Sequence, residues 1–169
     1  PPADSVIETV ALDGFAAREV RFAHSPGRLD PAYLNSLRAF DAAFVLADGI
    51  VAFARRHNMP VRGHTLVWDQ MIPSWLLHGD WTRRQLENVL RTYITTVVSH
   101  YRGKVEEWDV VNEPLTTDGH MRASIWERVI GPDYVALAFR WAHAADPSAR
   151  LFLNEYGAEW NDPKEHALF

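Results

Sequence analysis

The sequence contains no cysteine, which excludes disulfide bonds and thiolate metal sites. It also lacks any run near the roughly 20 apolar residues that a membrane-spanning helix needs, so we expect no membrane partner. Basic residues are few: 17 Lys and Arg against 22 Asp and Glu give a formal charge of −5, which argues against a nucleic-acid partner. No glycine-rich loop follows a predicted strand, and the histidines lack zinc-ligand spacing. The sequence therefore predicts no cofactor and no metal site.

The N-terminus, Pro1-Pro2-Ala3-Asp4, has neither a methionine nor the apolar run of a signal peptide. We therefore expect a processed, trimmed or excerpted chain. Its 169 residues, 47% of them hydrophobic, suffice for one domain with a core. Seven tryptophans is a high number, and tryptophan either packs in a core or stacks on flat apolar faces such as those of sugar rings.

Hydrophobic periodicity predicts strands and helices in alternation, which is typical of an α/β fold with parallel strands. The most regular helical pattern runs from Leu86 to Tyr101, and Thr82 with Gln85 forms a capping-box sequence before it. The predicted strands are 61–68, 105–113 and 150–156, with further strands over 6–12 and 19–22. The predicted helices are 44–57, 82–101, 124–130 and 132–145, with Pro132 at the first position of the last one, a loop over 71–76, and a loop leading into another helix after 157.

The chain is organised around Glu107-Trp108-Asp109-Val110-Val111-Asn112-Glu113-Pro114. This stretch predicts a buried strand that ends in an amide and a carboxylic acid, because Pro114 prevents the ladder from continuing. Side chains alternate along a strand, so Asn112 and Glu113 are expected on opposite sides unless the tip is irregular. A carboxylic acid beside a carboxamide suits proton transfer to a bound hydroxyl or ether oxygen, and the alternative is an ordinary solvated glutamate.

All three predicted strands place polar or aromatic residues at their C-terminal ends: Trp68-Asp69, Asn112-Glu113 and Asn154-Glu155-Tyr156. Ligands and active sites gather at this edge in α/β barrels and in open α/β sheets. A histidine in a strand is more commonly a hydrogen-bonded core residue, but His64 shares a strand face with Trp68, and this position strengthens the case for a functional role.

Three segments together resemble glycoside hydrolase family 10, the endo-β-1,4-xylanases. The segments are Arg62-Gly63-His64-Thr65-Leu66-Val67-Trp68, Trp108-Asp109-Val110-Val111-Asn112-Glu113 and Leu151-Phe152-Leu153-Asn154-Glu155-Tyr156. The similarity runs from about 47 to 159 in order. It implies a (β/α)8 barrel and a retaining mechanism, with these segments as barrel strands three, four and five. By this resemblance, residues 1–169 are the N-terminal part of a catalytic domain.

The resemblance also implies roles for individual residues. Glu113 matches the family's general acid/base, and Asn112 matches the residue that bonds the sugar 2-hydroxyl. His64 and Trp68 match positions that line the subsite just before the scissile bond. Asn154 and Tyr156 match the end of the fifth strand, on the leaving-group side. The implied partner is xylan or a xylo-oligosaccharide, and the implied location is extracellular; the oligomeric state is left open.

The chain departs from the family pattern at three places. Met71 stands at a position that is usually glutamine, and the sugar-binding Glu-Asn…Lys motif of the second strand is not found in residues 13–46. The family's nucleophile is a glutamate after the seventh strand, and this chain is too short for eight units, since a barrel takes about 250 residues. Carboxylates near the strand tips are Asp69, Glu155 and Glu159, none at the family's nucleophile position, and Asp109 is expected to be a structural hydrogen-bonding group.

Three functions therefore remain: a xylanase, a non-catalytic remnant that binds xylan, and another β-glycanase of similar fold. We expect His64, Trp68, Asn112 and Glu113 to face one cleft at the C-terminal ends of the strands, around a space that fits one sugar ring.

Overall fold

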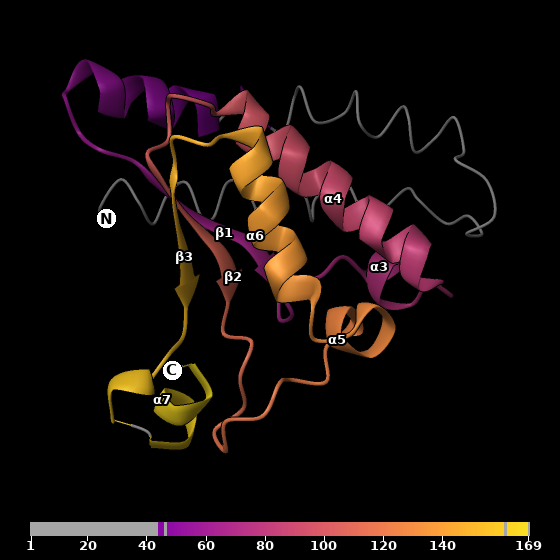
Figure 1. The fold of residues 1–169 in the computed structure, drawn as a ribbon. Coiled ribbons are helices and arrows are strands. Elements are labelled where there is room, and N and C mark those ends of the chain that lie inside the picture. Colours follow the sequence, from indigo (N-terminus) through magenta and orange to yellow (C-terminus); the bar gives the residue numbers. More distant parts are fainter. Residues whose placement is uncertain (1–43, 46, 161, 169) are drawn as a thin grey trace.

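The computed structural model describes residues 44–45, 47–160 and 162–168, which form a parallel sheet with helices packed on it (Figure 1). The predicted strands over 6–12 and 19–22 lie outside these residues. A helix over 44–45 and 47–56 comes first, and Asn58, with φ 53°, follows its end in a left-handed conformation. The elements that follow are β1 (Arg62–Trp68), α3 (Ser74–Leu77), α4 (Arg83–His100), β2 (Glu107–Asn112), α5 (Ile125–Ile130), α6 (Tyr134–Ala145), β3 (Arg150–Asn154), η2 (Ala158–Trp160) and α7 (Asp162–Leu168).

The sheet has the order β1-β2-β3, and both pairs are parallel, which confirms the prediction from the alternation of strands and helices. Trp68 pairs with Asn112, and Asn112 pairs with Asn154, so the three strands end at one edge. The register shifts between His64 and Val67, where the peptide between His64 and Thr65 is cis. Figure 1 shows the loop after β2 and helix α7 beyond the C-terminal ends of β2 and β3.

Helix α4 forms where the sequence predicts it. Its N-cap Thr82 accepts a hydrogen bond from the backbone N–H of Gln85, and the Gln85 side chain accepts one from the backbone N–H of Thr82. Its buried stripe is Leu86, Leu90, Ile94, Val97 and Val98. The helix packs against α5 and α6, and α6 lies on β2, so one layer of helices covers one side of the sheet (Figure 1).

Two local predictions are wrong. Pro132 does not open α6: Gly131, with φ 94°, turns the chain, and the helix begins only at Tyr134, whose N–H donates to the Gly131 carbonyl. The segment 71–76 is not wholly a loop, because α3 begins at Ser74. The Pro73 carbonyl accepts hydrogen bonds from the N–H groups of both Leu76 and Leu77, which closes this helical turn.

The core is continuous from the first described helix to α6 and includes buried tryptophans at 108 and 126. Core packing therefore accounts for part of the high tryptophan content. Among the described residues, no helix is both long enough and apolar enough to cross a membrane.

Candidate active site

Glu113 lies immediately after β2, and its backbone leaves the extended conformation there, with φ 49°. This left-handed conformation costs a residue other than glycine roughly 1–2 kcal/mol, so neighbouring groups must hold it. The N–H of Glu113 donates to the Asn154 carbonyl at 2.7 Å, and its own carbonyl accepts from Arg122 Nε at 2.8 Å. The irregular tip removes the strand alternation that would place Glu113 and Asn112 on opposite sides.

Glu113 is half-buried as a residue, and its carboxyl group has a neighbour that sequence reasoning missed. Gln70 Nε2 lies 3.4 Å from Glu113 Oε2. Gln70 precedes Met71, the residue that stands where the resemblance expects a glutamine, and Met71 is itself exposed. The contact could have been predicted from the sequence, because a glutamine stands only one position before the expected one.

The two predicted asparagines meet at the strand ends. Asn154 Nδ2 donates to Asn112 Oδ1 at 2.7 Å, and Asn112 is 3% exposed. Because the Asn112 oxygen is used in this bond, its amide nitrogen is the group that remains to donate to a ligand hydroxyl.

His64 is oriented by a carboxylate on the neighbouring strand. Its Nδ1 lies 2.8 Å from Asp109 Oδ2, and Arg62 Nε lies 3.2 Å from both carboxylate oxygens. Burial raises the pKa of Asp109, but the hydrogen bonds from His64 and Arg62 and the positive charge of Arg62 outweigh burial, so this pKa is below its usual value. A charged Asp109 only accepts, so the His64 Nδ1 carries a proton. Asp109 thus accepts hydrogen bonds from Arg62 and His64, in agreement with the structural hydrogen-bonding role that the sequence predicts.

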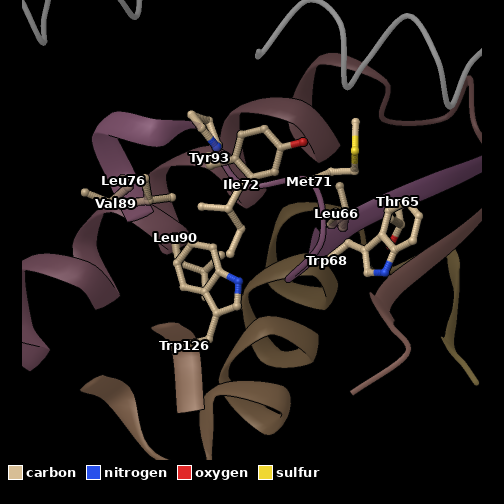
Figure 2. A pocket seen from close by; sticks show the side chains of 11 residues that line it. Thr65, Leu66, Trp68, Met71, Ile72, Leu76, Val89, Leu90, Tyr93 and Trp126 are labelled. Atoms are coloured by element: carbon tan, nitrogen blue, oxygen red, sulfur yellow. The ribbon is translucent and has the colours of Figure 1, made fainter. Parts of the chain in front are cut away.

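Trp68 lies beside His64, with ring centroids 6.3 Å apart and an interplanar angle of 62°. Figure 2 shows it at the wall of an apolar pocket between the end of β1, the 71–76 segment and α4. Leu90 and Trp126 line the same pocket, but His64, Asn112 and Glu113 do not. The single cleft that would join all four predicted residues therefore stays a prediction.

Tyr156 follows β3 and is 68% exposed, and Trp160 beside it is 67% exposed. Their rings meet edge to face with centroids 5.9 Å apart. Exposed aromatic faces suit stacking on sugar rings. No sequence pattern marks Trp160 as a site residue, because only the turn of η2 brings it next to Tyr156.

The three other carboxylates near the strand tips have different surroundings. Glu155 is 2% exposed at its side chain and is bonded to Lys164, and Glu159 is exposed in η2. Burial raises the pKa of Asp69, and this effect outweighs the opposing charge of Arg122. Nothing in these contacts pairs any of the three with Glu113. Nor do three His, Asp or Glu side chains converge as metal ligands anywhere in 44–45, 47–160 or 162–168.

The family model for "Glycosyl hydrolase family 10" matches residues 31–169. The chain belongs to this family. Endo-1,4-beta-xylanase B of Thermotoga neapolitana is 44% identical over 126 residues, 75% of this family 10 chain and 36% of that protein. Exoglucanase XynX of Acetivibrio thermocellus is 43% identical over 135 residues, 73% of this chain and 12% of that protein.

Among solved structures, xylanase 10B from Thermotoga petrophila RKU-1 in complex with xylobiose is similar at 46% identity with a TM-score of 0.72. The match covers 74% of this family 10 chain and 38% of that chain. The fold is accordingly part of a (β/α)8 barrel. The chain spans little more than a third of the length of these xylanases.

Proposed function

We propose that the protein is a retaining endo-1,4-β-xylanase in which Glu113 is the general acid/base. The observation that carries this proposal is the position of Glu113: its backbone turns out of β2 beside the Asn112–Asn154 pair, at the edge where the three strands end. Family membership and the xylanase relatives support the reaction class, and a xylobiose-bound relative supports a xylo-oligosaccharide as the ligand.

In this mechanism Glu113 first gives its proton to the glycosidic oxygen of the leaving sugar and later takes a proton from the water that releases the product. Asn112 donates its amide N–H to the sugar 2-hydroxyl. His64 and Trp68 hold the sugar before the scissile bond, and Asn154 and Tyr156 contact the leaving side. A retaining enzyme also needs a nucleophilic carboxylate about 5–5.5 Å from the acid/base, and we propose that it is none of Asp69, Glu155 and Glu159.

The decisive experiment is the Glu113→Gln substitution in the complete gene product. General acid catalysis contributes about 10²–10⁴-fold, so turnover of xylan should fall by about that factor while xylan binding is retained. An aryl xyloside with a good leaving group needs little protonation, so its first step should survive and a glycosyl-enzyme intermediate should accumulate. Glu159→Gln makes the same chemical change at an exposed carboxylate and should leave both rates unchanged. Equal loss on both substrates in Glu113→Gln would contradict the proposed role.

A second experiment locates the nucleophile. We expect no covalent product when the purified 169-residue chain is incubated with a 2-fluoro aryl xylobioside and weighed by mass spectrometry, and negligible xylanase activity. Labelling of Asp69, Glu155 or Glu159, identified by peptide mapping, would assign the nucleophile to this chain and overturn the prediction.

Two alternative functions can be tested in the same experiments. The relative named an exoglucanase favours a second candidate, a β-glycanase that acts on glucans. Comparing kcat/KM for xylo-oligosaccharides and cello-oligosaccharides separates these two substrate classes. Binding of xylan without turnover of either substrate by the complete gene product would identify a non-catalytic xylan-binding protein. We also propose an extracellular location, which cell fractionation tests.

A further inference from the structure

The structure contains a buried ion pair that the proposed mechanism does not use. Lys164 on α7 places its Nζ 2.6 Å from Glu155 Oε1, and the two side chains are 5% and 2% exposed. The same Nζ donates to the Tyr156 carbonyl at 2.7 Å. Removing two charges from water is costly, and apolar residues of similar volume often stabilise such a site as well or better. The pair therefore calls for an explanation other than stability.

The second carboxylate oxygen of Glu155 reaches the chain just beyond Glu113. Glu155 Oε2 accepts the N–H of Leu115 at 3.0 Å. Pro114, between Glu113 and Leu115, has a fixed φ and no N–H. On the other side, the N–H of Glu113 donates to the carbonyl of Asn154 at 2.7 Å. Adjacent residues 154 and 155 thus hold the backbone on both sides of the Glu113–Pro114 unit.

A close backbone contact also joins the loop after β2 to the start of α7. Gly119, in the loop after β2, has φ 79°, and a Cβ built on it would lie 2.3 Å from the carbonyl oxygen of Pro163. Pro163 directly precedes Lys164. The loop after β2 therefore packs against the N-terminal end of α7, next to the residue whose side chain bonds to Glu155.

We propose that Glu155 and Lys164 are positioning residues for Glu113: the ion pair fixes a hydrogen-bond acceptor that holds the left-handed backbone of the acid/base. This inference rests on the proposed function. Lys164 orients the Glu155 carboxylate, the carboxylate holds the Leu115 N–H, and Pro114 transmits this restraint to Glu113. A general acid must meet the glycosidic oxygen within hydrogen-bond distance, and a displacement of about 1 Å can cost about 10²-fold in rate.

Two double variants isolate the acceptor without leaving a buried charge unpaired. Glu155→Leu with Lys164→Met replaces the pair by apolar side chains and removes the acceptor for the Leu115 N–H. Glu155→Gln with Lys164→Met is the matched control, because the glutamine amide oxygen can still accept from Leu115. Both are made in the complete gene product, and thermal melting tests whether each is folded.

The readout compares two substrates that differ in their need for a proton donor. For the Glu155→Leu/Lys164→Met variant (the Leu/Met variant), we expect kcat on xylo-oligosaccharides to fall about 10–100-fold with little change in KM. On an aryl xyloside with a good leaving group, the rate of the first step should fall less than about threefold. The Gln/Met variant keeps the acceptor but lacks the Lys164 that orients it, so its kcat on xylo-oligosaccharides should fall at least about threefold less than that of the Leu/Met variant. A purely structural role would lower the rates on both substrates by the same factor, and that result overturns the proposal. Full activity of the Leu/Met variant on both substrates overturns it as well.

Hydrogen exchange tests the same contact without using activity. In the unsubstituted protein the amides of Glu113 and Leu115 should exchange as slowly as those inside β2, and the Leu/Met variant should lose this protection. Rapid exchange in the unsubstituted protein overturns the positioning role whether or not the variants fold. If the unsubstituted protein hydrolyses neither substrate, the proposed function fails, while the exchange result still decides whether Glu155 holds this backbone.

Discussion

At the scale of single residues, the neighbours of Asp109 keep its carboxyl group charged. Asp109 lies within β2 and is 4% exposed, and it accepts hydrogen bonds from Arg62 and His64 on β1. The guanidinium neutralises the carboxylate, and the carboxylate in turn fixes the proton on His64 Nδ1. Residue 109 therefore orients the histidine that we place next to the sugar.

This arrangement predicts acid sensitivity. The pKa of Asp109 is lower in the folded chain than in the unfolded chain, where it is about 3.9, so its contribution to stability is fully present above about pH 4. It is lost as the pH falls through the folded-state pKa. We expect Asp109→Asn to lower the free energy of unfolding at pH 7 by about 1–3 kcal/mol and to flatten its dependence on pH below about pH 4. Denaturant titrations across this range measure both effects. Asp80→Asn, at an exposed site, should leave the pH slope unchanged; an unaltered slope in Asp109→Asn would refute this account.

Among the secondary-structure elements, β1 and β2 approach each other through a glycine. Gly63 pairs with Trp108, which is 2% exposed, and a Cβ at residue 63 would lie 2.2 Å from the Trp108 ring. The indole is enclosed by the core and cannot swing into solvent. The close packing of β1, which carries His64, on β2, which leads to Glu113, therefore depends on the missing side chain at position 63.

We expect Gly63→Ala to lower the free energy of unfolding by about 1–3 kcal/mol, because the added methyl group overpacks the core against Trp108. Gly49→Ala is the matched control: it lies in the first described helix with nothing within 4 Å of the added Cβ, and it should stabilise the chain by about 0.4–1 kcal/mol. Chemical denaturation compares the two. Equal effects of both substitutions would show that the contact with Trp108 does not determine the outcome.

At the scale of the molecule, the dominant feature is the sheet, which is open at both edges among the described strands. Within the part of the chain that the structure describes, β1 and β3 each pair with β2 alone. The side chains of Leu151, Phe152 and Leu153 on β3 are only half-buried, whereas β2 is buried almost throughout. A strand with apolar side chains and one unpaired edge is a template for association.

We therefore predict that the 169-residue chain by itself dimerises through its open edge or aggregates. Light scattering coupled to size exclusion should show species larger than a monomer whose fraction falls on dilution. Leu153→Lys places a charge on the edge strand and should reduce association, because lysine on an edge strand opposes pairing. A monodisperse monomer that melts cooperatively at all concentrations would count against this prediction.

Features that depend on neighbouring residues could be predicted from the sequence alone. Helix α4 was predicted to within a residue at each end, because its capping box spans four residues and its apolar stripe repeats within two turns. The parallel sheet followed from the alternation of strands and helices, and the shared edge followed from the sheet. Family membership was likewise evident from the strand segments that include His64, Glu113 and Asn154.

The details of the site were decided only by the tertiary structure. The turn of Glu113 out of β2 depends on the hydrogen bond that its N–H donates to the Asn154 carbonyl and on the one that Arg122 donates to its own carbonyl. The charge of Asp109 depends on Arg62, 47 residues away. Gln70 reaches Glu113 across 43 residues, and Glu155 reaches Leu115 across 40. Sequence patterns report hydrogen bonds and packing within a turn or a strand. Contacts between residues some 40 positions apart form only when the strands and the loops that follow them come together at one edge, so no local signal specifies which side chains meet there.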